Sequence, residues 1–480
     1  MIDVTCADVA AAVGGTVHGL AESADQVDIG SVAADSRAVE PGAMFVAITG
    51  AQVDGHEYAV AAVEAGAVVV LSARQLPVPC IVVDDPVQAL GRLAHWYRRD
   101  RLTATVVAIT GSSGKTSTKD LVAAVLSTAG STVAAPGSFN TEVGVPLTVL
   151  SAEPSTQYLV LEMGMRGPGH IDYLCTITEP DIAVIVNVGS AHVGMLGSVE
   201  AIADAKGEII AGLAGHGIAV LNGDDPRVMS QCERTSARVV TFGAGSACQV
   251  RATDIRMDSR ARASFTLHAT EPMGAVPVTL RYQGEHFVSN ALAAAAVGLC
   301  CGLPLDVVGA ALRATESTSP MRMQIQEERH GITVINDAYN ANPESMAAAL
   351  RTLAVMAAGR RSWAVLGQMR ELGESSNSAH EEIGRLAAEL GISRLLCIGT
   401  PAEAIASGAA SVAGWTGQAQ AVPDIAAAAV LLRESLLADD ILLVKASRGI
   451  ALDEVLVQVF SQPLHLDSEA VVDAKVEDTA

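Results

Sequence analysis

Residues 108–117 of this chain read Ala-Ile-Thr-Gly-Ser-Ser-Gly-Lys-Thr-Ser, between the apolar run 104–110 and a helical pattern at 119–129. In a strand, loop and helix of this kind, backbone N–H groups at the helix N-terminus bind phosphate oxygens. Lys115 would then reach the β- and γ-phosphates of a nucleotide, and the Thr116 hydroxyl could coordinate Mg²⁺. Ile109 stands where the strict phosphate-loop pattern has glycine, so the loop is a shortened form. The pattern predicts a nucleotide site formed by Gly111, Ser112, Ser113, Gly114, Lys115, Thr116 and Ser117.

Apolar runs around this loop are typical of buried parallel strands, and they lie at 104–110, 158–163, 181–188 and 217–222. Each is followed by a glycine-containing loop and most by a helical stretch, which predicts an α/β nucleotide-binding core ending near residue 318. Four later apolar runs predict a second, smaller sheet with alternating helices, and they lie at 332–336, 362–366, 394–398 and 440–444.

The predicted fold class is α/β with three domains. Residues 1–98 form a small mixed α/β domain, 99–318 a central P-loop ATPase-type parallel sheet, and 319–463 a C-terminal Rossmann-like doubly wound sheet. Residues 464–480 carry many acidic side chains with little helical periodicity, which predicts an acidic flexible tail.

The overall charge narrows the classes of partner. The 480 residues contain 53 acidic and 31 basic side chains, giving a formal net charge of −22, so we expect no nucleic-acid partner. The sequence has no secretory signal pattern and no uninterrupted apolar run of about 18 residues, so we expect a cytoplasmic protein without a membrane span. The eight cysteines have no spacing suited to zinc, and we expect them to be reduced.

Two polar residues follow the predicted strands that neighbour the phosphate loop. Glu162 lies at the end of the apolar residues 158–161, and His192 follows the run 181–188. Parallel strands present their carboxyl ends at one edge of a sheet, so both side chains should lie near Thr116 and could hold a hard metal ion. Taken alone, His192 would be read as a loop or packing histidine.

Taken together, these motifs resemble the ATP-dependent Mur ligases of peptidoglycan synthesis. The resemblance extends over nearly the whole chain through Asp35-Ser36-Arg37, Asn140-Thr141-Glu142, the run Gly-Glu-His-Phe-Val-Ser-Asn-Ala at 284–291, and Asn-Asp-Ala-Tyr-Asn-Ala-Asn-Pro at 336–343. In this family the lysine that corresponds to Lys206 is carbamylated, which turns an ammonium into a carboxylate ligand for Mg²⁺.

The resemblance implies roles for named residues. Lys115, Lys206 and His192 would be catalytic, and two Mg²⁺ ions would be held by Thr116, Glu162, His192 and Lys206. ATP would further contact Asn290, Arg322 and Asp337. The remaining substrates would contact Ser36, Arg37, Asn140, Thr141, Asn340, Lys445 and Arg448.

The implied reaction joins D-alanyl-D-alanine to UDP-N-acetylmuramoyl-tripeptide through an acyl phosphate, with ATP and Mg²⁺ as cofactors. We expect a monomer whose third domain rotates about a hinge near residues 316–322.

One alternative is another Mur-type or folylpolyglutamate-synthase-like ligase. The ligase that acts one step earlier in the pathway and adds the third amino acid would carry an Asp-Asn-Pro-Arg motif, which is absent from this sequence. An alternative of another class is a P-loop ATP-binding switch without ligase activity. Such a switch would carry an Asn-Lys-x-Asp motif that binds guanine, which is absent from this sequence, or it would hydrolyse its nucleotide slowly and independently of any amino acid.

Overall fold

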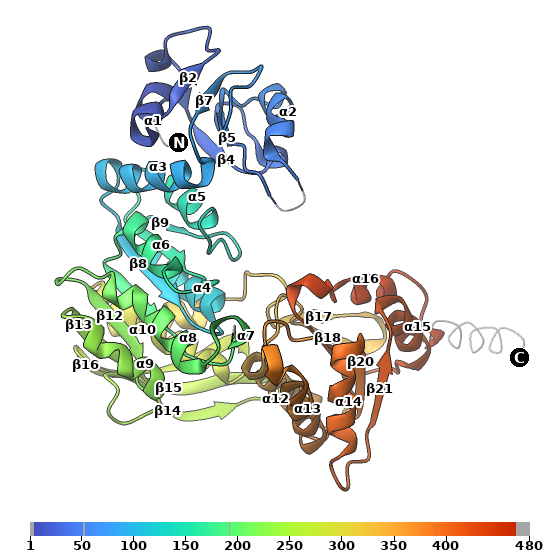
Figure 1. The fold of residues 1–480 in the computed structure, drawn as a ribbon. Coiled ribbons are helices and arrows are strands. Elements are labelled where there is room, and N and C mark those ends of the chain that lie inside the picture. The colour runs from blue at the N-terminus through green and yellow to red at the C-terminus, as the bar shows by residue number, and fades with distance from the viewer. Residues whose placement is uncertain (1–3, 51–52, 192, 467–480) are drawn as a thin grey trace, which may run out of the picture.

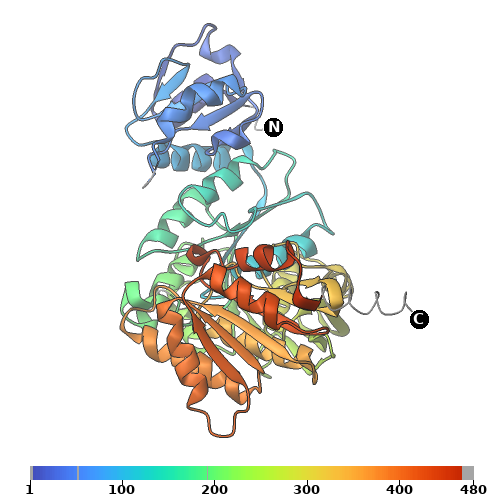
Figure 2. The ribbon, with the colours of Figure 1, turned by 90° about the vertical axis from the view of Figure 1, so that its right-hand side faces the viewer.

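The computed structural model describes residues 4–50, 53–191 and 193–466, which form three successive α/β units (Figure 1). The N-terminal unit packs on the central unit and lies away from the C-terminal unit in both views (Figure 1 and Figure 2). Residues 467–480, which hold most of the predicted acidic tail, lie outside the described residues. Within the described ranges, every helix is too short or too polar to span a membrane.

The N-terminal unit contains β1 (Val4–Thr5), α1 (Cys6–Val13), β2 (Thr16–His18), β3 (Asp28–Ile29), β4 (Ser31–Ala33), β5 (Ala43–Val46), α2 (Ala59–Glu64), β6 (Val69–Ser72) and β7 (Cys80–Val82). Five of these strands form one sheet in the order β2-β7-β6-β5-β4, in which the β2–β7 pair is antiparallel and the others are parallel. This mixed sheet agrees with the mixed α/β character that the sequence predicts.

Helix α3 (Pro86–Arg101) joins this unit to the central one. It begins after Asp85, whose carboxylate accepts the N–H groups of Val87 at 2.8 Å and Gln88 at 3.2 Å. One side of α3 packs on α1, and the other packs on α5 (Gly144–Leu150) and α6 (His170–Thr178). We propose residues 1–98, 99–318 and 319–463 as the domain ranges, with α3 running across the first boundary.

The central sheet has nine strands: β8 (Thr105–Thr110), β9 (Thr132–Ala134), β10 (Tyr158–Glu162), β11 (Ile182–Ile185), β12 (Ile218–Asn222), β13 (Arg238–Gly243), β14 (Val250–Met257), β15 (Arg262–Thr270) and β16 (Met273–Gln283). Their order is β16-β15-β14-β13-β12-β11-β8-β10-β9, and every pair from β14 to β9 is parallel. The antiparallel pairs of β14, β15 and β16 extend the parallel sheet, and the apolar runs did not predict them.

Helices cover both faces of this sheet, so β8 alternates its side chains between two cores. Val107 and Ile109 belong to the core that includes α4 (Lys115–Leu126), α10 (His286–Cys300) and α11 (Leu305–Ala314). Val106 and Ala108 belong to the core that includes α3, α6 and α8 (Val199–Ala211). Helix α4 begins at Lys115, earlier than the predicted 119, because the last phosphate-loop residues form its first turn.

The C-terminal unit contains β17 (Gln324–Glu327), β18 (Thr333–Asn336), α12 (Pro343–Ala357), β19 (Ser362–Gly367), α13 (Ser376–Glu389), β20 (Arg394–Ile398), α14 (Glu403–Ala410), β21 (Gln418–Val422), α15 (Ile425–Ser435), β22 (Ile441–Lys445) and α16 (Glu454–Phe460). The sheet order is β17-β18-β22-β19-β20-β21, and only β17 is antiparallel among the described strands. Helices α12 to α14 pack on one face, and α15 and α16 pack on the other. The doubly wound sheet predicted from sequence is therefore confirmed.

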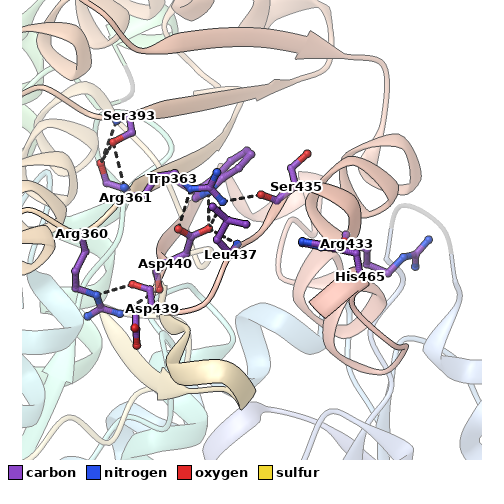
Figure 3. Close-up of polar contacts among 11 residues, drawn as sticks. Arg360, Arg361, Trp363, Ser393, Arg433, Ser435, Leu437, Asp439, Asp440 and His465 are labelled. Carbon is purple, nitrogen blue, oxygen red and sulfur yellow. Dashed lines mark hydrogen bonds and ion pairs between the residues drawn. The ribbon is translucent and has the colours of Figure 1, made fainter. Parts of the chain in front are cut away.

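A buried carboxylate ties together the starts of two neighbouring strands of this sheet (Figure 3). Asp440, just before β22, is 1% exposed and accepts the guanidinium of Arg361 at 2.6 and 2.9 Å. It also accepts the indole N–H of Trp363 at 3.0 Å and the backbone N–H of Leu437 at 2.8 Å. Four donors thus satisfy one buried charge, which makes its removal costly.

Replacing Asp440 with alanine should lower the free energy of unfolding of this unit by about 3 kcal/mol, because Arg361 loses its buried partner. Differential scanning calorimetry would measure the loss as a lower melting temperature. Glu434→Ala removes an exposed carboxylate from α15 and should leave the melting temperature nearly unchanged. Equal melting temperatures for Asp440→Ala and Glu434→Ala would contradict the role of Asp440.

Candidate active site

The phosphate loop lies between β8 and α4 and lines a cavity of about 740 Å³. Gly114 has φ +76°, and a Cβ at this position would lie 2.7 Å from the side-chain oxygen of Asn290. Any other residue would therefore be strained and would collide with Asn290, which is buried on α10. The first turn of α4 begins at Lys115, and its N–H groups have no acceptor within the helix. The predicted loop residues Ser112, Ser113, Gly114, Lys115, Thr116 and Ser117 line the cavity.

Asn187 holds the loop from the end of the neighbouring strand. Its side-chain oxygen accepts the N–H groups of Ser112 at 3.0 Å and Ser113 at 2.9 Å. Its amide nitrogen donates to the carbonyl of Ser113 at 3.1 Å. Two N–H groups of the loop are thus occupied by protein, which leaves the turn at Gly114 and the start of α4 as the part that can receive phosphate. Nothing in the sequence pattern indicates a role for Asn187, although it lies within the predicted strand 181–188.

Oxygen atoms suited to a metal ion meet at the end of β10. Glu162 is 1% exposed, and its carboxylate accepts the hydroxyl of Thr116 at 2.6 Å and the amide of Asn140 at 2.7 Å. A buried carboxylate beside a hydroxyl offers the hard oxygen ligands that Mg²⁺ prefers. The predicted ligand His192 lies outside the described residues. Within the described ranges, no three His, Cys, Asp or Glu side chains come together as a metal site.

Lys115 lies close enough to the Glu162 carboxylate and to Lys206 for their charges to interact. Lys115 donates to the carbonyl of Gly111 at 2.8 Å, and burial lowers the pKa of its ammonium, with Arg322 adding to the shift and Glu162 opposing it. Lys206 on α8 is 1% exposed. Burial, followed by repulsion from Lys115, lowers the pKa of Lys206 well below its usual value. Lys206 therefore loses its proton more readily than an exposed lysine does.

The C-terminal unit supplies the opposite wall of the cavity. The carboxylate of Asp337 binds the ammonium of Lys445 at 2.5 Å, and Lys445 also donates to the carbonyl of Asn340 at 2.9 Å. The guanidinium of Arg322 lies 4.1 Å from the ring centre of Tyr339. These predicted residues are thus brought together with the phosphate loop, and Arg448 lines the same cavity.

Contacts across the cavity join the central and C-terminal units. The side-chain amide of Asn342 donates to the carbonyl of Ser112 at 3.2 Å. The carboxylate of Glu344 accepts the N–H of Ser190 at 2.7 Å. The sequence motif at 336–343 was recognised, but nothing in it indicated that Asn342 would touch the phosphate loop.

The other predicted residues lie at or beyond the edge of this cavity. Thr141 adjoins Asn140, and its hydroxyl accepts the N–H of Gly144 at 3.4 Å. Ser36 and Arg37 belong to a short helix of the N-terminal unit, where Arg37 is 88% exposed and pairs with Asp35 at 2.7 Å. Among the described residues, those lining the cavity include neither Ser36 nor Arg37.

Three family models match successive parts of the chain. The Mur ligase family catalytic domain matches residues 28–98, the Mur ligase middle domain 109–298, and the Mur ligase glutamate ligase domain 321–448. A protein of Mycobacterium leprae named UDP-N-acetylmuramoyl-tripeptide--D-alanyl-D-alanine ligase is 44% identical, covering 94% of this chain and 97% of that protein. The chain belongs to the Mur ligase family.

Solved structures agree with this assignment. A crystal structure of MurF from Acinetobacter baumannii matches this Mur ligase with a TM-score of 0.85 and 30% identity, covering 96% of this chain and 99% of that one. MurF ligase from Thermotoga maritima in complex with ADP matches with a TM-score of 0.75 and 29% identity, covering 90% and 97%. The predicted family and the three-domain α/β fold are confirmed, and this Mur ligase is an ATP-dependent ligase.

His286, a half-buried histidine that lines the cavity, contributes to the pH dependence of the stability of this Mur ligase. Burial lowers the pKa of His286 to about 4, while Asp337 raises it and Lys445 lowers it slightly. The unfolded chain binds a proton at this histidine below about pH 6.5, whereas the folded protein does so only near pH 4. Protonation therefore favours the unfolded state, and stability is lost as the pH falls through this window.

Between pH 6.5 and pH 4, the melting temperature of His286→Gln should fall less than that of the wild type, because glutamine does not titrate. Thermal unfolding at a series of pH values would measure the difference. The matched control is His216→Gln, which replaces an exposed histidine and should follow the wild-type profile. Parallel profiles for wild type and His286→Gln would show that His286 is not the group responsible.

Proposed function

We propose that this Mur ligase joins D-alanyl-D-alanine to UDP-N-acetylmuramoyl-tripeptide with the hydrolysis of ATP to ADP and phosphate. The observation that carries the proposal is a single cavity in which the phosphate loop faces the C-terminal motif at 336–343. The 44% identity to the Mycobacterium leprae ligase of that name, over 94% of this chain, supports the choice of substrates. We further propose that the protein acts as a monomer, because one chain supplies both the phosphate loop and the motif that faces it across the cavity.

The first step activates a carboxylate. An oxygen of the terminal tripeptide carboxylate forms a bond to the γ-phosphorus of ATP, the bond from that phosphorus to the bridging oxygen breaks, and ADP leaves. Lys115 and the first turn of α4 would stabilise the negative charge on the transferring group. Arg322 and Asp337 would hold the phosphates and ribose of ATP, and Asn290 behind Gly114 would contact adenine.

Thr116 and Glu162 fit Mg²⁺ by chemistry, since both are oxygen ligands and their side-chain oxygens lie 2.6 Å apart. Mg²⁺ would neutralise phosphate charge there. A second ion would be held by His192 and by carbamylated Lys206. The lowered pKa of Lys206 supports carbamylation, because only a neutral amine attacks carbon dioxide.

The second step forms the amide. The amine of D-alanyl-D-alanine attacks the carbonyl carbon of the acyl phosphate, and inorganic phosphate leaves with the former carboxylate oxygen. Lys445 and Arg448 would bind the carboxylate of the incoming dipeptide, and Asn340 would orient it. Asn140 and Thr141 would contact the tripeptide. Ser36 and Arg37 in the N-terminal unit would hold the uridine diphosphate end of the same substrate.

Purified protein should release phosphate from ATP only when both UDP-N-acetylmuramoyl-tripeptide and D-alanyl-D-alanine are present, and mass spectrometry should detect a UDP-linked pentapeptide. Lys115→Met should lower kcat about 100-fold or more, because the transferring phosphoryl group loses a cation. Release of phosphate from ATP in the absence of both substrates would indicate an ATP-binding switch and not a ligase. Release with the tripeptide and a free amino acid would favour another ligase of the family.

Lys206→Ala should lower kcat about 100-fold, and acetate or formate should restore part of it by occupying the place of the carbamate. Lys206→Met is the matched control, because its side chain fills the space and should block rescue by these anions. Full activity of Lys206→Ala, or equal responses of the two variants to acetate, would contradict the carbamate.

A further inference from the structure

A second lysine of helix α4 is buried one turn beyond the phosphate loop. Lys119 is 3% exposed, and its ammonium donates to the carbonyl oxygens of Ala135 at 2.5 Å and Gly137 at 3.0 Å. It also lies 3.0 Å from a carboxylate oxygen of Asp120. A buried ammonium is unfavourable unless its donors have partners, and three oxygens surround this one. The mechanism above gives this lysine no role.

The backbone held by this ammonium leads directly to two contacts of the active site. Residues 135–140 follow β9 and end at Asn140, which donates to the carboxylate of Glu162 at 2.7 Å. Within the same loop, the hydroxyl of Ser138 contacts the hydroxyl of Tyr339 in the C-terminal unit. The conformation of this loop therefore affects both the orientation of Glu162 and one contact between the two units.

The carboxylate that pairs with Lys119 also binds the segment joining the two units. The second oxygen of Asp120 accepts the hydroxyl of Ser319 at 2.5 Å, and Ser319 lies between α11 and β17. Both side chains border a groove of about 410 Å³ that also includes Ala135 and Gly137. A rotation of the C-terminal unit about residues 316–322 would move Ser319 relative to Asp120.

We propose that Lys119 is a positioning residue that fixes residues 135–140 and thereby the orientation of Glu162. Asp120 links the same loop to the hinge at Ser319, so that the loop is held most firmly when the hinge has the arrangement seen here. The inference rests on the proposed function, and it adds a connection between the hinge and the metal-binding carboxylate of Glu162 that does not pass through the substrates.

Lys119→Met tests the role, because methionine keeps the length of the side chain and removes its three donors. Backbone hydrogen exchange at residues 135–141 should become at least tenfold faster, measured by mass spectrometry. The kcat for ligation should fall at least tenfold, while the KM for D-alanyl-D-alanine should change less than twofold, because the proposed contacts of this substrate, Asn340, Lys445 and Arg448, belong to the C-terminal unit. Lys119→Arg keeps the charge and should restore slow exchange and most of kcat.

Ser319→Ala tests the link to the hinge. It should speed exchange at residues 135–141 by a smaller factor, because Asp120 loses one of its two partners. Ser317→Ala changes an exposed residue of the same segment and should leave exchange unchanged.

Unchanged exchange at residues 135–141 in Lys119→Met would overturn the proposal, as would lost activity that Lys119→Arg does not rescue. If Lys119→Met does not fold, equal exchange in Ser319→Ala and Ser317→Ala would overturn it. A wild-type enzyme that forms no UDP-linked pentapeptide would refute the proposed function instead, and the exchange measurement would still decide the role of Lys119.

Discussion

The register of β8 against its two neighbours is the constraint on which the active site depends. Glu162 pairs with Ile109 across β10 and β8, and Ile185 pairs with Thr110 across β11 and β8. The phosphate loop, the Glu162 carboxylate and the Asn187 side chain therefore emerge at one edge of the sheet. Because β8 is buried on both faces, a shift of one residue would turn each of its side chains toward the opposite core.

The sequence predicted the parts of the fold that bury continuous apolar runs. All four runs around the phosphate loop and all four in the C-terminal unit are strands, because a parallel strand covered on both faces has apolar residues at nearly every position. The extension formed by β14 to β16 was missed. Along β15, buried residues alternate with more exposed ones, and such a pattern is harder to separate from surface chain without knowing what covers it.

For the site, local motifs predict the phosphate loop and its neighbouring carboxylate, the family resemblance implies several residues that are distant in the chain, and two asparagines that bind the loop were missed. Lys115, Thr116 and Glu162 follow from a loop and a strand end. Asn187 binds a loop 75 positions earlier in the chain, and Asn342 binds the same loop from 230 positions away. An asparagine that joins two units cannot be distinguished in the sequence from one that caps a turn. Only the folded structure shows which of these roles it has.

Helix α3 contributes to an apolar core that the N-terminal and central units share. A single apolar cluster includes Leu90 and Tyr97 of this helix, residues of α1 on one side, and residues of α5 and α6 on the other. If recombination replaced the N-terminal unit alone, the residues of the central unit that pack in this shared core would lose their native partners. Recombination within this family should therefore be poorly tolerated near residue 98, where α3 carries this core across the boundary.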